Sequence, residues 1–536
     1  MHVESTSVLV VGGSLVGLSA AVFLAWRGVR TVLVERHAGS SPHPRAIGYT
    51  PRTLELYRAV GLGPHIPQVP PGFRLRRARV ESLAGAWFEE VPWTPGEQAA
   101  PPIERSPCTG AAIAQDRLEP RLRDRAVELG ADVRLETELT RFEQDPGGVT
   151  AWLRERDGRE VALRASYLVA ADGHRSAIRE ALGIGRTGRG RIRAVRSVLF
   201  RAPLEEYLRT GVTQFAIEQP GFSAFLTTYG DGRWVLIFWD DEERDAATLR
   251  ALISRAIGRA DLEIEIVTTG RWEISALVAD RFTSGRVFLA GDAAHTLPPN
   301  RGGYGANTGI EDAHNLAWKL SAVLSGASTP ELLDTYDAER RPIAWLRHHQ
   351  IFAREDYKAH AGGTAGGVPI LDDDAMELGQ LVRSTAVLGA GDGLPPALRP
   401  EQWAGQPGTR APHAWVVRGG ERLSTLDLLQ RRWVLLTEDA RWRPAAAQAG
   451  EQLGIELECV LIGADVRSSD DGALCRAFGL GAGGASLVRP DGYVAWRSLD
   501  LPEDPAGALA DALGRVSSAP RHTMTPDERP ETAVGA

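Results

Sequence analysis

The sequence predicts an α/β protein in which a parallel-sheet domain is combined with an antiparallel sheet and a third, C-terminal unit. Three observations lead to this prediction. The chain opens with an apolar strand, a helix rich in Ala and Leu, and a second apolar strand, which together form a βαβ unit. Residues 190–280 alternate apolar and polar side chains, as a half-buried antiparallel sheet does. Residues 413–515 again alternate short apolar strands with helical segments.

Length, composition and charge narrow the class of protein. A chain of 536 residues is longer than a usual domain of about 100–200 residues, so we expect two or three domains. Its net charge of −8 gives no basic surface for nucleic acid. The three cysteines lack CxxC spacing and a neighbouring His cluster, which argues against a zinc site or disulfide framework and fits a reducing cytoplasm. We expect no signal peptide and no membrane span, since the first apolar stretch is short.

The first motif is Gly-Gly-Ser-Leu-Val-Gly at residues 12–17, between the first strand and helix. A dinucleotide fingerprint places glycines at the tight turn, at the pyrophosphate and at the helix–strand contact. Ser14 replaces the second glycine, but it is small and can bond a phosphate. Such a turn can be purely structural. Glu35 ends the next strand about twenty residues on, where an acid binds a ribose hydroxyl, and this favours a nucleotide site.

The second motif begins with Gly-Asp-Ala-Ala-His at residues 291–295 and continues into the glycine-rich segment 302–307. An Asp at the end of a strand can accept hydrogen bonds from a polyhydroxyl chain. Amides at the following helix N-terminus can stabilise negative charge on an electron-rich ring. The alternative is an ordinary helix cap with a glycine-rich loop.

With the segment Tyr167–Ser176 (YLVAADGHRS), these motifs resemble the group A flavoprotein aromatic hydroxylases, the para-hydroxybenzoate hydroxylase type. The chain is more similar still to bacterial hydroxylases of aromatic polyketide antibiotic biosynthesis, over nearly its whole length. The resemblance implies a Rossmann-like FAD-binding domain with an inserted β-sheet substrate domain and a C-terminal thioredoxin-like domain without redox cysteines. The expected boundaries are residues 1–75, 105–185 and 281–395 for the FAD-binding domain, 76–104 and 186–280 for the sheet domain, 400–516 for the thioredoxin-like domain, and 517–536 for a disordered tail.

The resemblance also implies a non-covalent FAD site assembled from separated segments. The expected contacts are Gly12, Gly13, Ser14, Leu15, Val16 and Gly17 at the pyrophosphate; Glu35 and Arg36 at the adenosine ribose; Leu139 at adenine; Arg45 near the cofactor; Gln115 at the flavin; Asp172 near both FAD and the nicotinamide donor; Asp292 at the ribityl chain; and Pro299, Gly303, Gly305, Ala306 and Asn307 along the isoalloxazine. The segment 298–303 is one residue longer than the family pattern, so the resemblance does not define the contacts of Asn300 and Arg301.

Because the family's sheet covers the flavin, it is expected to line the substrate pocket, and the candidates are Phe225, Thr227, Trp234, Leu236 and Phe238. The alternative for the aromatic residues is plain core, since a register error of one residue exchanges the two faces of a strand.

Several polar residues have competing interpretations. His295 is a weak candidate for a catalytic base, and the alternative is that its ring orients the loop after the strand. Asp116, Asp312 and His314 are expected to be helix caps or helix-surface residues. Glu119 is expected on an exposed helix face.

The implied activity is FAD-dependent monooxygenation of a bulky phenolic or polycyclic aromatic substrate with O₂ and NAD(P)H, through a flavin C4a-hydroperoxide. No second fingerprint occurs, so NADPH or NADH is expected to bind transiently. Baeyer–Villiger or epoxidising chemistry on the same scaffold stays open. So does a non-catalytic flavin-binding protein that sequesters a reactive intermediate. The oligomeric state also stays open, with a homodimer as one candidate.

Overall fold

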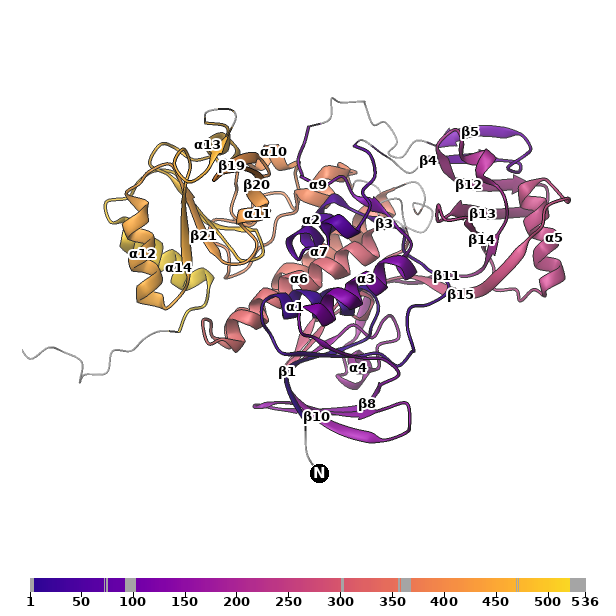
Figure 1. The fold of residues 1–536 in the computed structure, drawn as a ribbon, viewed down its shortest axis with the longest axis horizontal. Helices are drawn as coiled ribbons and strands as arrows, with labels where there is room; N and C mark the ends of the chain where they lie inside the picture. Colours follow the sequence, from indigo (N-terminus) through magenta and orange to yellow (C-terminus); the bar gives the residue numbers. More distant parts are fainter. Residues whose placement is uncertain are drawn as a thin grey trace, which may run out of the picture. The chain divides into compact units, whose positions relative to one another are not determined.

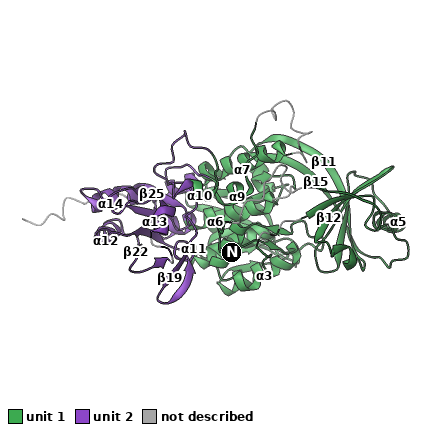
Figure 2. Cartoon of the chain, turned by 90° about the horizontal axis from the view of Figure 1, so that it is seen from above, with its two compact units in different colours: residues 1–318, 336–380, 396–402 green, residues 319–335, 381–395, 403–536 purple. Residues whose placement is uncertain are grey.

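A computed structural model of the chain describes residues 4–71, 73, 76–91, 103–299, 303–354, 357, 368–468, 470 and 472–520. The chain forms two compact units, coloured separately in Figure 2. Unit 1 comprises residues 1–318, 336–380 and 396–402, and unit 2 comprises residues 319–335, 381–395 and 403–536.

The first sheet of unit 1 is mainly parallel and has the strand order β16-β17-β10-β1-β2-β7. Its strands are β1 (Glu4–Val11), β2 (Thr31–Val34), β7 (Asp132–Arg134), β8 (Glu138–Asp145), β9 (Gly148–Arg154), β10 (Glu160–Ala170), β16 (Thr283–Ser284) and β17 (Val287–Leu289). β1 runs parallel to β2 and to β10, and the antiparallel pair β8–β9 extends the sheet beside β10. The predicted βαβ opening is therefore confirmed.

Some helix ends in unit 1 coincide with residues that favour helix termini. α1 (Leu15–Trp26) follows Ser14, and Gly28 lies after its end with a φ of 77°. α2 (Pro51–Ala59) has proline in its first turn and is capped by the Thr50 hydroxyl, which accepts from Thr53 N. The other helices that lie wholly or mostly in unit 1 are α3 (Gln115–Glu128), α4 (Ala177–Ala181), α5 (Ala246–Ile257), α6 (Tyr304–Leu324), α7 (Thr335–Ala353), α9 (Asp373–Leu378) and α10 (Pro400–Trp403) (Figure 1).

Helix α6 differs from its prediction at the N-terminal end. The apolar periodicity predicts a helix from about residue 310, whereas α6 begins at Tyr304. Gly305 and Gly309 lie in its first turns, and glycine lowers helix propensity by about 1 kcal/mol relative to alanine. The additional turns place residues 304–307 of the glycine-rich segment inside α6.

The second sheet of unit 1 has the order β18-β15-β11-β14-β13-β12-β4-β5. Its strands are β4 (Arg76–Val80), β5 (Trp87–Val91), β11 (Arg186–Arg201), β12 (Val212–Gln219), β13 (Phe222–Thr228), β14 (Arg233–Phe238), β15 (Glu265–Ala279) and β18 (His295–Thr296). Helix α5 packs on one face, where Leu249 and Ile253 join the buried apolar side chains of the strands. The predicted antiparallel sheet is confirmed, with one parallel pair between β12 and β4. A separate two-stranded sheet joins β3 (Gly48–Tyr49) to β6 (Ala111–Ala112).

Unit 2 contains a four-stranded sheet with the order β22-β21-β24-β25. The helices and strands of unit 2 are β19 (Trp415–Arg418), β20 (Glu421–Ser424), α11 (Thr425–Leu428), β21 (Trp433–Thr437), α12 (Trp442–Leu453), β22 (Leu457–Leu461), β23 (Arg467–Ser468), α13 (Ala473–Phe478), β24 (Ala485–Val488), β25 (Val494–Ser498) and α14 (Pro505–Val516). β21 and β22 are parallel and linked by α12, whereas β24 and β25 form an antiparallel pair followed by α14. This βαβ–ββα order is that of a thioredoxin-like domain, and the β24–β25 hairpin turns at Asp491-Gly492.

The sequence also leads to predictions about the C-terminal tail, the cysteines and membrane-spanning helices. The backbone amides of residues 517–519 donate to carbonyl groups of α14, so the prediction of a disordered tail is wrong for these three residues. Residues 521–536 lie outside the described residues. Cys108, Cys459 and Cys475 form no disulfide within the described part of the chain. Among the helices that the structure describes, none has the length and apolar composition needed to cross a bilayer.

Candidate active site

The turn between β1 and α1 explains which glycines the first motif requires. A Cβ on Gly12 would lie 2.3 Å from Ala171 O, and one on Gly17 would lie 1.8 Å from Gly12 O. A Cβ on Gly13 would lie 2.5 Å from Glu35 Cβ. Neighbouring backbone and side chains therefore exclude side chains at these three positions. Ser14 has an extended backbone (φ −94°), so the departure from the fingerprint does not distort the turn.

Ser14 directs its hydroxyl toward α3 instead of capping α1. Its Oγ donates to Glu119 Oε1 at 2.6 Å and accepts from Gln115 Nε2 at 3.0 Å, and no side chain caps the helix. The amides at the start of α1, around Leu15 and Val16, are thus left for an anion such as a pyrophosphate.

Glu119 is buried, whereas the sequence predicts that it lies on an exposed helix face. It is only 2% exposed, because the face of α3 that carries Gln115, Glu119 and Leu122 is buried. Gln115 Nε2 donates to Glu119 Oε1 at 2.7 Å, and Gln115 Oε1 accepts from the amides of Arg45 and Ala46 at 3.3 Å each. The helix bearing Gln115 therefore connects the glycine turn to the segment that contains Arg45.

Glu35 lies at the end of β2 beside the glycine turn. Its carboxylate accepts from Gly13 N at 2.7 Å and from His37 N at 2.8 Å. Thr137 N donates to Glu35 O at 2.9 Å, which brings the start of β8, with the half-buried Leu139, next to this strand end. Arg36 is exposed at the same end. The residues predicted to hold the adenosine half thus lie along one edge of the parallel sheet.

Asp172 follows β10, the strand next to β1. Its Oδ2 accepts from Ile178 N at 3.3 Å, whereas its Oδ1 is buried without a hydrogen-bond partner among the described residues. Burial raises the pKa of this carboxyl group, and the hydrogen bonds and Arg179 only partly counter that effect. An unsatisfied buried carboxylate oxygen is costly and points to a ligand that donates a hydrogen bond there.

The Gly291–Ala293 turn is a short 3-10 helix that packs directly on the first motif. A Cβ on Gly291 would lie 2.8 Å from Val16 Cγ2, and one on Gly309 would lie 2.5 Å from the same atom. Asp292 is half-buried in this turn. Burial lowers the pKa of His174, and Asp292 opposes this shift while Arg45 adds to it. Asp292 and Arg45 therefore act on the same histidine, next to Asp172.

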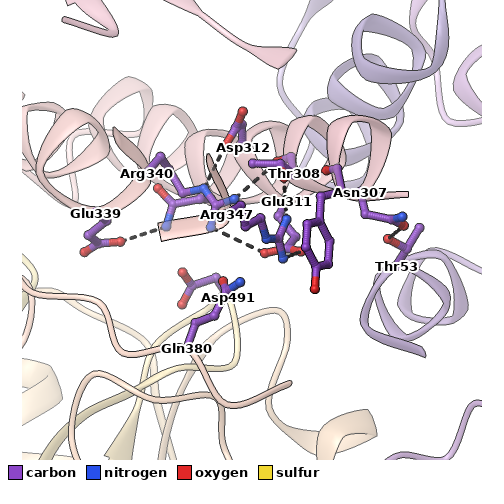
Figure 3. A network of polar contacts seen from close by, with 12 residues as sticks. Thr53, Asn307, Thr308, Glu311, Asp312, Glu339, Arg340, Arg347, Gln380 and Asp491 are labelled. Atoms are coloured by element: carbon purple, nitrogen blue, oxygen red, sulfur yellow. Dashed lines mark hydrogen bonds and ion pairs between the residues drawn. The ribbon is translucent and has the colours of Figure 1, made fainter. Parts of the chain in front are cut away.

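The start of α6 is anchored by Asn307. Its Oδ1 accepts from Thr53 Oγ1 at 2.6 Å (Figure 3). Oδ1 also accepts from Thr50 N at 3.1 Å, and Nδ2 donates to Gly303 O at 2.9 Å. The side chain predicted to contact the isoalloxazine is thus occupied in holding α2 to this loop. Pro299 is exposed, while Gly305 and Ala306 are half-buried in the first turn. The inserted residue, with Asn300 and Arg301, lies outside the described residues.

His295 and Asp312 form a buried pair, which corrects the expectation that Asp312 lies on a helix surface. Both side chains are 0% exposed, and His295 Nε2 lies 2.7 Å from Asp312 Oδ2. Burial alone would raise the pKa of Asp312, but His295 and Arg340 more than offset this and lower it. His295 also packs against Phe282. These contacts support the orienting role, not the catalytic one.

The expectation for His314 is corrected in the same way, whereas Asp116 lies at a helix end, as expected, with an additional partner. His314 is buried and packs edge-on against Phe23, with ring centroids 5.0 Å apart. Asp116 lies in the first turn of α3 and forms an ion pair with Arg233 of β14 at 2.7 Å. Periodicity could not identify either contact, since the partners are distant in sequence.

The five predicted pocket residues divide between the two faces of the second sheet. Trp234, Leu236 and Phe238 belong to the core beneath α5. Phe225 pairs with Ile237, and Thr227 pairs with Val235, so these four share the opposite face. The prediction that all five line one pocket is therefore wrong: the assignment of β14 was one residue out of phase.

Comparison with known proteins agrees with this geometry. Residues 5–350 match the family model described as FAD binding domain, and residues 404–520 match the model described as aromatic-ring hydroxylase, C-terminal. The chain belongs to the FAD-dependent aromatic-ring hydroxylases. It is an FAD-dependent monooxygenase that uses NAD(P)H, and the uncapped start of α1, the glycine turn and Asp172 Oδ1 fit the cofactor.

Individual relatives of this hydroxylase align over nearly their full length. A putative polyketide hydroxylase of Streptomyces halstedii is 43% identical, covering 92% of this chain and 94% of that protein. A 4-methyl-5-nitrocatechol 5-monooxygenase of a Burkholderia species is 41% identical, covering 95% and 97%. The crystal structure of a ternary complex of aklavinone-11 hydroxylase with FAD and aklavinone has a TM-score of 0.86 at 38% identity, covering 96% of this chain and all of that one.

Proposed function

We propose that this enzyme hydroxylates a polycyclic aromatic substrate of the polyketide type, bound against the sheet face that carries Phe225 and Thr227. One oxygen atom of O₂ enters the ring, the other leaves as water, and NAD(P)H supplies both electrons. Bound FAD supplies the redox chemistry, that is, acceptance of the hydride and activation of O₂. The work of the protein is to hold the ring in position and to exclude water.

The observation that carries this proposal is the connection between that sheet and the Arg45 segment. The hydroxyl of Ser197, on β11, lies 2.8 Å from His43 Nε2. The hydroxyl of Tyr229 donates to Pro44 O at 2.6 Å. The adjacent amides of Arg45 and Ala46 bond Gln115, as described above. A substrate on this sheet would thus lie beside residues that we assign to the flavin.

The cofactor contacts are part of the same proposal. We assign the phosphates to the amides of residues 12–17, the ribityl chain to Asp292, and the ring to the loop before α6. These elements fall in the proposed FAD-binding segments 1–75, 105–185 and 281–395, and the sheet segments 76–104 and 186–280 bind the substrate. We further propose a cytoplasmic enzyme, and a homodimer is its candidate assembly.

A substrate panel tests the proposal. Aklavinone, the ligand in the related crystal structure, and 4-methyl-5-nitrocatechol, for which the Burkholderia monooxygenase is named, represent the large and small substrate classes. We expect polycyclic phenols to stimulate NAD(P)H oxidation and yield a product with one added oxygen. Stimulation by nitrocatechol alone would contradict the size class, and a lactone or epoxide product would indicate the alternative oxygen insertions. Flavin binding without stimulated oxidation across the panel would favour a sequestering protein.

Two matched variants test the sheet face. Phe225→Ala should raise KM with little effect on stability, since Phe225 is half-buried on the proposed pocket face. Trp234→Ala should instead lower the free energy of unfolding by about 3–5 kcal/mol, since Trp234 lies in the core under α5. If Trp234→Ala raised KM and Phe225→Ala lowered the stability instead, our assignment of the pocket face would be wrong.

A further inference from the structure

Helices α6 and α7 share a buried cluster of charges, which we call the α6–α7 charge cluster: Glu311, Asp312, Arg340 and Arg347 (Figure 3). Each side chain is at most 5% exposed. Arg347 Nη2 bonds Glu311 Oε1 at 2.7 Å, and Arg340 Nε bonds Asp312 Oδ1 at 2.7 Å. Buried ion pairs rarely add stability relative to an apolar core, so such a cluster calls for another explanation.

Asp312 connects this cluster to the Gly291–His295 turn. Its Oδ2 accepts from Gly291 N at 3.2 Å, at the start of the turn, and lies 2.7 Å from His295 Nε2, at its end. Asp292 lies between these two anchored residues. The carboxylate thus holds both ends of the segment that carries the proposed ribityl ligand.

Arg340 in turn holds Asp312. It bonds Oδ1 through Nε, and its Nη2 donates to Thr308 O at 3.2 Å. The guanidinium plane therefore fixes the carboxylate against the backbone of α6, which leaves Oδ2 facing the turn. A lysine ammonium has one nitrogen and cannot make both bonds in this planar geometry.

We propose that Arg340 is a positioning residue for FAD: it holds Asp312, and Asp312 fixes the Gly291–His295 turn so that Asp292 is presented to the cofactor. The inference rests on the proposed role of Asp292 as the ribityl ligand. No cofactor contact by Arg340 or Asp312 is required. Arg340 lies outside the three segments that carry the family resemblance, on α7, about fifty residues after the turn.

Arg347 provides a matched control on the same helix. Both arginines are 1% exposed, and both pair with Glu311. Arg347, however, directs Nη1 to Thr308 Oγ1 and lies over the Tyr304 ring, with its Cζ 5.5 Å from the centroid. A general loss of buried charge pairing would affect both variants, whereas a loss of turn positioning would affect only one.

The experiment compares Arg340→Lys with Arg347→Lys in the full-length protein. FAD is titrated into purified apoprotein, and the dissociation constant is measured by flavin fluorescence quenching, together with the melting temperature of each apoprotein. We expect Arg340→Lys to raise the Kd for FAD about tenfold or more, and Arg347→Lys to change it less than about threefold. Equal Kd values for the two variants would overturn the proposal. If Arg340→Lys does not fold, Asp312→Asn, which removes an acceptor of the turn, must raise the Kd similarly.

A double-mutant cycle with Asp292→Ala separates this inference from the proposed site. If Arg340 acts through Asp292, Arg340→Lys should not weaken FAD binding further when Asp292 is already alanine. Additive losses would refute the positioning role. If Asp292→Ala alone leaves the Kd unchanged, the assignment of the ribityl ligand fails, whatever the result for Arg340→Lys.

Discussion

Replacing Asp172 by Asn should stabilise the FAD-free protein, although Asp172 lies in a signature motif of the site. Its Oδ1 is buried without a partner among the described residues, and its Oδ2 accepts a 3.3 Å bond from Ile178 N. Hydrogen bonding to Ser176 and Ile178 lowers the pKa of this carboxyl group less than burial raises it. Leaving a buried group unsatisfied costs about 1–3 kcal/mol, and more when the group is charged. Asparagine keeps the size and the acceptor while removing the charge. We therefore expect a gain of about 1 kcal/mol at pH 7, or about 1–2 °C in melting temperature for a unit of this size.

The effect of Asp172→Asn on stability should depend on pH, because Asp172 can bind a proton and asparagine cannot. Burial raises the pKa of Asp172 in the folded protein. Between the unfolded value, about 4, and the raised folded value, the folded state holds more protons than the unfolded state, so wild-type stability falls as the pH rises. The advantage of Asp172→Asn should thus be smallest near pH 4 and fully present above the folded pKa.

The assay is thermal unfolding of apoprotein at several pH values from 4.5 to 7.5 or so. Asp231→Asn is the matched control. Burial alone would raise the pKa of Asp231, but the Arg233 guanidinium, 2.9 Å from Oδ2, lowers it instead. This control should destabilise the protein at pH 7. The reasoning fails if Asp172→Asn melts below wild type at pH 7, or if its advantage does not change with pH.

Three further predictions concern the cofactor and the thiols. The purified protein should be yellow, and acid precipitation should release all of its flavin; colour that remains in the pellet would indicate covalent attachment. Asp292→Ala should weaken FAD binding about ten- to a hundredfold. The control is Glu128→Ala, which should leave FAD binding unchanged because the Glu128 side chain is 64% exposed. Equal affinities of the two variants for FAD would refute the assignment of Asp292 to the ribityl chain. Replacing Cys459 and Cys475 by serine should leave turnover within about threefold, because burial raises their pKa values to about 11 and about 12 and so disfavours reactive thiolates. A hundredfold loss in folded, FAD-loaded protein would show that the thiols participate.

The sequence predicts the elements of this fold better than the contacts between them. Strand β1, helix α1 and strand β2 follow from local periodicity and from Gly12 and Gly28, because short-range sterics determine them. Periodicity also predicts the second sheet. It does not determine which face of β14 looks inward, because a shift of one residue exchanges the faces and both faces carry apolar residues.

Buried polar residues are the main class of residue whose burial could not be predicted from the sequence. Glu119, Asp312 and His314 have the composition of helix-surface residues, yet each is buried by a contact from a distant segment. The partner of Asp312, Arg340, lies 28 positions further along the chain. Charge patterning within a helix carries no information about such pairs, since they depend on how α6 and α7 pack against the turn. The same is true of the bond between Ser197 and His43.

The central claim is that this chain activates O₂ on FAD and transfers one oxygen atom to an aromatic substrate. The most direct test is a turnover experiment with the FAD-loaded protein, NADPH, ¹⁸O₂ and an aromatic polyketide such as aklavinone, analysed by mass spectrometry of the product. We predict a hydroxylated product that carries one ¹⁸O atom, formed with substrate-stimulated NADPH oxidation. Product oxygen derived from water, or stoichiometric peroxide release without product from any polycyclic phenol, would contradict the claim.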